Sequence, residues 1–159
     1  MAEAATQQTP TEALIATLDL PQGGWSDAAR KDALSRLQQA GLPERRDEYW
    51  KYTRPDTLTQ PQAVSAAVRA SEDVALFDQI DRLKLVFVDG VFDADASDDL
   101  ALEGITIERL AQADADLHWA RDLYGTLEKN GQTPVARPLA ALNTAFAADG
   151  VLIHVTDKV

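Results

Sequence analysis

The chain has 159 residues, of which 45% are hydrophobic and 26% are charged, and it contains no cysteine. These values suit a soluble globular domain that buries a core without disulfides, and they exclude a thiolate site for a metal or a cluster within this chain. The net charge is −11, and residues 71–122 hold 14 acidic and 4 basic side chains. We therefore expect neither nucleic acid nor an anionic membrane as a partner. The acidic stretch indicates a solvated face or, alternatively, a protein-interaction module for a basic partner.

The N-terminus shows no targeting signal. Residues 1–8 are polar, carry Glu3 and have neither Lys nor Arg, unlike a secretory or transit peptide. No apolar run approaches the roughly 20 residues that span a bilayer. The sequence predicts a cytoplasmic protein, with a disordered tail over residues 1–8 and a domain over residues 9–150.

Two helices are predicted in the first 40 residues. Thr9 and Glu12 have the spacing of a capping box, with a proline between them at the first helical position. Ser26 predicts the N-cap of an amphipathic helix over residues 27–40. Gly41 suits the left-handed residue that commonly follows a helix.

The clearest strand signal lies over residues 83–92. Two apolar runs flank Asp89-Gly90, a pair that tolerates the positive φ angles of a two-residue turn, so we expect a β-hairpin. Residues 105–107 are predicted to form another short strand, and residues 64–68 a further one.

Apolar side chains at helical spacing predict two further helices, ending at Asn130-Gly131 and Asp149-Gly150. The apolar positions are Leu117, Ala120, Tyr124 and Leu127 in the first helix and Leu139, Leu142 and Phe146 in the second. Alternating apolar residues then predict a final strand from Val151. The fold class expected from all these elements is α+β, with N-terminal helices, a small sheet around the hairpin, two further helices and a last strand.

Three blocks of sequence resemble one known family. Residues 41–53, GLPERRDEYWKYT, are similar to the G-L-P-x-R-R-x-E-x-W-K-Y-T stretch of the SufD family of iron–sulfur cluster assembly proteins. Residues 85–92, LVFVDGVF, resemble its hairpin, and residues 142–151, LNTAFAADGV, resemble its helix-to-strand junction. The first block is the most specific, because a dozen ordered positions with Trp, Tyr and paired Arg rarely agree by chance.

The resemblance implies a longer protein. SufD-type chains continue into a right-handed β-helix, through which they pair with each other or with SufB, and into C-terminal helices that dock the ATPase SufC. Residues 151–159 are then expected to be the first strand of a truncated β-helix. The chain is accordingly identified as the N-terminal portion of a non-catalytic scaffold subunit that acts with SufB and SufC, and the portion itself is expected to be monomeric.

The matched motif supplies the candidate site. Its residues are Arg45, Arg46, Glu48, Trp50, Lys51, Tyr52 and Thr53, followed by Arg54. Arginine offers a planar fork of donors that suits phosphate or carboxylate, so a small anion-binding domain or enzyme built on this cluster is the alternative function. The structural interpretation pairs the arginines with nearby carboxylates and anchors the otherwise irregular segment, residues 44–61, in the core through Trp50.

No other residues indicate a catalytic, cofactor or metal site. His118 and His154 have no metal-ligand spacing between them, and each is expected to be a surface or packed side chain. The aspartates of residues 93–99 lack the glycine and terminal glutamate of a calcium loop. No nucleophile or phosphate-binding motif occurs, so we expect no enzyme and no cofactor in this chain.

Overall fold

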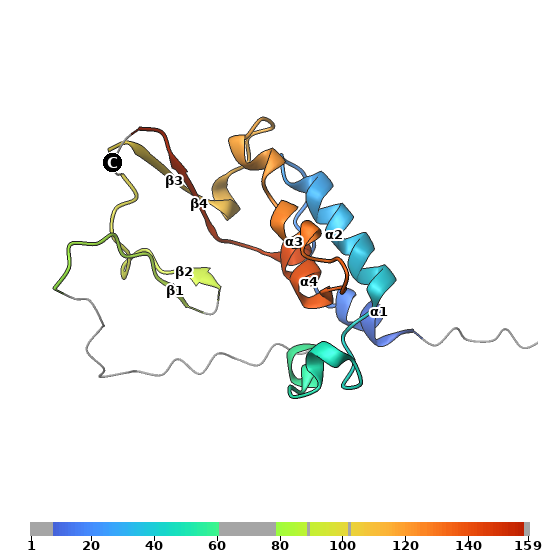
Figure 1. Ribbon diagram of the computed structural model, residues 1–159. Coiled ribbons are helices and arrows are strands. Elements are labelled where there is room, and N and C mark those ends of the chain that lie inside the picture. Colours follow the sequence, from blue (N-terminus) through green and yellow to red (C-terminus); the bar gives the residue numbers. More distant parts are fainter. Residues whose placement is uncertain (1–7, 61–78, 89, 102, 158–159) are drawn as a thin grey trace, which may run out of the picture. The chain divides into compact units, whose positions relative to one another are not determined.

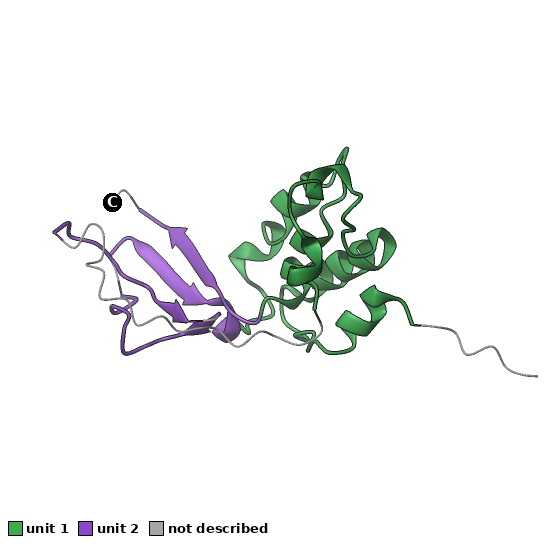
Figure 2. Ribbon diagram, turned by 90° about the horizontal axis from the view of Figure 1, so that it is seen from below, with its two compact units in different colours: residues 1–63, 114–147 green, residues 64–113, 148–159 purple. Residues whose placement is uncertain are grey.

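The chain forms two compact units in the computed structural model, which describes residues 8–60, 79–88, 90–101 and 103–157. The helical unit comprises Met1–Ala63 and Asp114–Ala147, and the strand unit comprises Val64–Ala113 and Ala148–Val159 (Figure 2). We expected one domain over residues 9–150, whereas the structure divides this span between the two units. The expected tail over residues 1–8 and the expected strand over residues 64–68 lie outside the described residues, apart from residue 8.

Helix α1, Pro10–Ile15, begins with the predicted capping box. The Glu12 amide donates to Thr9 Oγ1 at 3.2 Å, and the Thr9 amide donates to Glu12 Oε2 at 2.7 Å. These bonds satisfy donors that the first turn of a helix leaves without a partner. Leu14 of this helix is 5% exposed and packs in the core.

Helix α2, Asp27–Ala40, has the predicted bounds and packs against α4, Pro138–Phe146 (Figure 1). Ala33 and Leu37 of α2 are fully buried, as is Ala145 of α4. The small alanine side chains allow the two helix backbones to approach closely. Gly41 ends α2 with φ 72°, a conformation that glycine adopts without strain.

The continuous helix predicted through Leu117 and Leu127 is wrong. The chain forms a 3-10 turn, η4, at Trp119–Asp122 and a short helix, α3, at Thr126–Asn130. Gly125 separates them with φ 76°, and a Cβ atom there would lie 3.1 Å from Thr144 Cγ2. The left-handed backbone of Gly125 therefore interrupts the helix, and Leu117 and Leu127 are more than 80% exposed.

The predicted hairpin is confirmed but is shorter than expected. Strands β1, Phe87–Val88, and β2, Val91–Phe92, pair antiparallel, and Gly90 in the turn has φ 80°. The amides that precede β1 have other partners: Val86 N donates to Ser97 Oγ at 2.8 Å, and Lys84 N donates to an Asp98 carboxylate oxygen. Side chains of the following loop thus take these two amides, while the Val86 and Lys84 carbonyls accept from the Asp93 and Asp98 amides.

Strands β3, Ile105–Arg109, and β4, Val151–Val155, form a second antiparallel pair, in which Ile107 faces Ile153. A single 3-10 turn, η3, Leu110–Gln112, follows β3. The described elements confirm the α+β class. β4, which we expected to lead into a β-helix, pairs here with β3. No helix of the described residues is both long and apolar enough to cross a membrane.

Candidate functional site

The motif segment, residues 41–58, is fastened to the helical unit at both ends. At its start Leu42 N donates to Thr11 Oγ1 at 3.0 Å, and Pro43 is buried. Near its end Pro55 is among the most deeply buried side chains. The segment contains two 3-10 turns, η1, Glu48–Trp50, and η2, Pro55–Leu58, where an irregular segment was predicted.

The aromatic side chains of this segment are more exposed than we expected. Trp50 is half-buried rather than enclosed in the core. It lines an apolar groove of about 380 Å³ together with Leu42 and Pro138. Tyr49 and Tyr52 are 63% and 92% exposed, so neither contributes much to the core.

The arginines do not form the expected network with neighbouring carboxylates. Arg45 and Arg46 are exposed and make no ion pair with any described residue. Among the described residues Arg54 forms a long contact, 3.6 Å from its Nη2 to Asp56 Oδ2, between two side chains that are mostly exposed. Lys51 Nζ lies 5.5 Å from the centre of the Tyr52 ring, a cation–π distance. Thr53 continues the turn by donating its amide to the Trp50 carbonyl at 3.0 Å.

A pocket of about 620 Å³ lies beside these residues. Its lining tests the alternative function, in which the cluster binds a small anion. Arg45 and Arg54 line it, but so do three carboxylates, Glu44, Asp47 and Asp56. Asp47 Oδ2 accepts from Glu44 N at 2.8 Å and so stabilises the turn. A small anion in this pocket faces more negative than positive side chains, which disfavours it.

A buried cation, Arg30 on α2, was missed at the sequence level. It is 3% exposed, donates from Nε to Ser26 Oγ and from Nη1 to the Ala145 carbonyl, both at 3.0 Å, and lies 5.3 Å from the centre of the Tyr124 ring. Ser26 was predicted to cap α2 with its side chain, but no such bond forms. Arg30 stands three residues before the buried Ala33, and this spacing places it on the apolar face of the helix.

The same region holds an aromatic cluster. Trp25, with 5% exposure, stacks on His118 at 4.6 Å between ring centres and meets Tyr124 edge-on at 5.6 Å. Tyr124 donates its hydroxyl to the Thr144 carbonyl at 2.8 Å. Burial raises the pKa of Tyr124 against the opposing effect of Arg30. His118, expected to be a surface or packed histidine, is a packed one.

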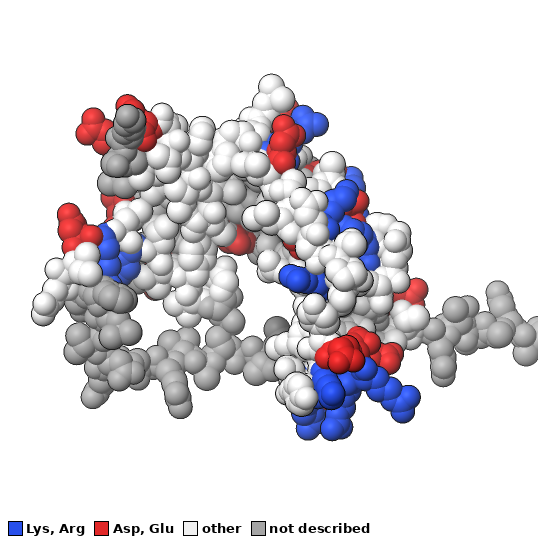
Figure 3. All heavy atoms as spheres, viewed as in Figure 1, with Lys and Arg blue, Asp and Glu red and all other residues white. Residues whose placement is uncertain are grey.

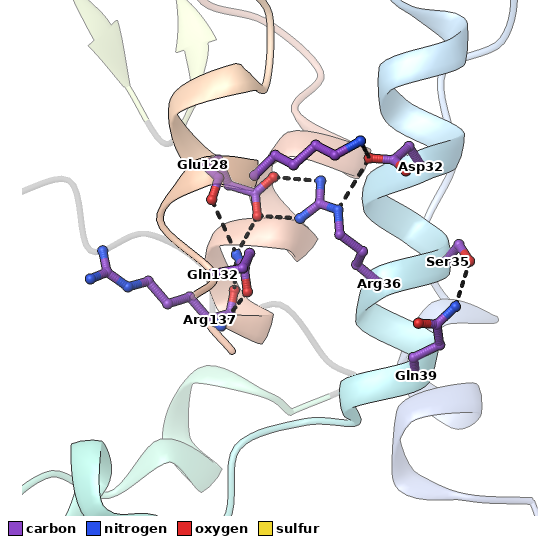
Figure 4. A network of polar contacts seen from close by, with 8 residues as sticks. Asp32, Ser35, Arg36, Gln39, Glu128, Gln132 and Arg137 are labelled. Carbon is purple, nitrogen blue, oxygen red and sulfur yellow. Dashed lines mark hydrogen bonds and ion pairs between the residues drawn. The ribbon is translucent and has the colours of Figure 1, made fainter. Parts of the chain in front are cut away.

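An ion network joins α2 to α3 (Figure 4). Arg36 donates two hydrogen bonds to the Glu128 carboxylate, at 2.6 and 2.8 Å, and one to Asp32 at 3.2 Å. The bond to Glu128 is the main cause that raises the pKa of Arg36. Burial opposes ionisation of Asp32, but its bonds with Arg36 and Lys129 outweigh burial and lower its pKa. The bidentate geometry fixes the orientation of α3 against α2.

The described residues contain no group of three or more His, Asp or Glu side chains placed to hold a metal ion. His154 is exposed on β4, in the strand unit, whereas His118 belongs to the helical unit. Within the aspartate loop, Asp93 Oδ1 accepts from Ala96 N and Asp99 Oδ1 accepts from Ala101 N. These carboxylates therefore stabilise turns.

The comparisons with known proteins agree on one family. The family model described as "SufBD protein N-terminal region" matches residues 23–159. The iron-sulfur cluster assembly protein SufD of Escherichia coli (strain K12) is 33% identical over 143 residues, which cover 79% of this chain and 30% of that relative. No solved structure matches. The chain therefore belongs to the SufBD family, as a SufD-type member matched over the family's N-terminal region.

Proposed function

We propose that the chain is the N-terminal part of a non-catalytic scaffold subunit of SUF-type iron–sulfur cluster assembly, working in the cytoplasm with SufB and SufC. The observation that carries this proposal is the similarity to SufD across most of the chain. The chain spans 30% of the length of that relative, so the activity and partners of a whole SufD-type protein reach it only as a proposal.

The architecture of the motif segment supports a role in presenting a surface. Its ends are fixed by buried prolines, while Arg45, Arg46 and Tyr52 project into solvent. A reaction site typically gathers polar groups in a concave, mostly apolar cavity with perturbed pKa values. The segment instead has the exposed, preorganised character of a contact surface.

Assembly of a chimera tests the proposal. Residues 23–159 of this chain replace the matching region of Escherichia coli SufD, and the chimera is mixed with SufB and SufC. We expect one complex containing all three proteins in size-exclusion chromatography with light scattering. The same chimera with Leu37→Asp, which places a charge at a fully buried position, is the matched control and should not assemble. A folded chimera that elutes apart from both partners would contradict the proposal.

A further inference from the structure

The outer side of the motif segment carries a concentration of cations. Arg45, Arg46, Lys51 and Arg54 are exposed, as is Tyr52, and we call these five residues the cation–tyrosine surface. Lys and Arg side chains gather on one side of this segment in Figure 3, and the carboxylates lie on its other side. Arg45 and Arg54 share a pocket with carboxylates, and Arg54 keeps its long contact with Asp56. Arg46 and Lys51 make no ion pair with any described residue, which leaves these two cations available to an outside partner.

The folding of the helical unit does not account for this surface. Tyr52 is 92% exposed, and the two arginines at its start form no ion pair with any described residue. Tyrosine, tryptophan and arginine are the residues enriched at protein interfaces, where they act as anchors. The buried Pro43 and Pro55 hold the segment in place, so binding here costs little conformational entropy.

The charge of the chain indicates what kind of partner fits. Residues 45–54 hold four basic and two acidic side chains, and Glu44 and Asp56 flank them, so this segment is neutral in a chain of net charge −11. A basic partner is attracted by the acidic remainder of the molecule, whereas the carboxylates of a partner are attracted by Arg46 and Lys51. Nucleic acid, with its continuous negative charge, is repelled by the remainder of the chain.

We propose that an acidic segment of a partner protein docks on the cation–tyrosine surface. Its carboxylates pair with Arg46 and Lys51, and an apolar side chain between them packs on Tyr52. The Trp50 groove, about 380 Å³, is lined by Asp47 and Glu48 as well as by apolar residues, and it takes a second apolar side chain rather than a carboxylate. This inference goes beyond a role in cluster assembly and does not depend on it.

Fluorescence anisotropy with defined peptides tests the inference on the 159-residue chain. The probe is a labelled 12-residue peptide with four Glu and two Leu, and a second probe has Gln in place of each Glu. We expect the acidic probe to bind about tenfold more tightly than the Gln probe, because paired charges across an interface strengthen binding. Amide chemical-shift changes on the unaltered chain should centre on residues 45–54.

Matched substitutions separate this site from general attraction. Arg46→Gln and Tyr52→Ser should each weaken the acidic probe about fivefold or more, whereas Arg121→Gln, at another exposed arginine of the helical unit, should leave its affinity unchanged. Equal losses in the Arg46 and Arg121 variants would overturn the inference, as would shift changes that leave residues 45–54 unaffected. Tighter binding of a duplex oligonucleotide at the same residues would overturn it in favour of nucleic acid.

Discussion

Arg30 is a cation that lies buried in the helical unit. A buried guanidinium is costly unless hydrogen bonds replace its water. Here the water is replaced by Ser26 Oγ, the Ala145 carbonyl and the Tyr124 ring, and no carboxylate is among these partners. The Ala145 carbonyl belongs to the last turn of α4, where a cation also interacts favourably with the helix dipole. Arg30 thus connects α2 to the end of α4.

Arg30→Ala should therefore destabilise the helical unit by about 2–4 kcal/mol, since it removes buried packing and leaves a buried carbonyl without its donor. Urea denaturation followed by tryptophan fluorescence measures the loss. Lys31→Ala is the control at the next position, where the ammonium is exposed and pairs with Asp27. Similar midpoints for the two variants would contradict the role given to Arg30.

Trp50 and Trp25 differ in burial, and their replacement should differ in cost. Trp25→Ala removes an aromatic with 5% exposure and should cost about 3–5 kcal/mol. Trp50→Ala removes a half-buried one and should cost about 1–3 kcal/mol. Chemical denaturation of both variants checks the ranking. A loss at Trp50 as large as that at Trp25 would support the original expectation of a core anchor.

At the scale of elements, Asp149 connects the start of β4 to the end of β3. Burial opposes its ionisation, but hydrogen bonds from the Arg109 guanidinium and from the Gly150 and Ala111 amides outweigh burial and lower its pKa below the ordinary 3.8. The Arg109 guanidinium also lies 4.6 Å from the Phe92 ring centre, which ties β3 to the hairpin. One carboxylate thus stabilises the strand unit.

The pH dependence of stability follows from this lowered pKa. The contribution of Asp149 is complete above its unfolded-state pKa, near 3.8, and is lost as the pH falls through the lower folded-state value. Asp149→Asn should lower the free energy of unfolding by about 1–2 kcal/mol at pH 7 and flatten its decline below pH 4. Thermal melts between pH 7 and pH 3 check this. Asp95→Asn, at an exposed position, is the control, and an equal effect there would count against the assignment.

Local signals predicted the elements whose ends depend on neighbouring residues. The capping box fixes α1, and Gly41 fixes the end of α2. The helix predicted across Gly125 does not form as one element, because Gly125 adopts a positive φ beside Thr144, a residue that is distant in sequence. The candidate site also has local and long-range determinants. The motif predicted which residues lie in one segment, but the burial of Trp50 and the pairing of Arg45 depend on tertiary packing.

At the scale of the whole molecule, the chain enters the strand unit after residue 63 and returns to the helical unit at residue 114. From the family resemblance we expected SufC to dock on the C-terminal helices of a whole SufD-type protein. Residues 1–159 alone should then show no binding to SufC in a calorimetric titration at physiological salt, whereas the chimera with Escherichia coli SufD should bind. Micromolar or tighter binding of SufC to residues 1–159 that persists at high salt would place the docking surface in this region instead.

Complementation tests the central claim most directly. The chimera carrying residues 23–159 is expressed in an Escherichia coli strain that lacks its own SufD and depends on the SUF system, and the activity of an iron–sulfur enzyme is measured. We predict activity restored to the level given by intact SufD, and no restoration by the Leu37→Asp chimera. A chimera that accumulates as a folded protein but restores no activity would contradict a role for this chain in iron–sulfur cluster assembly.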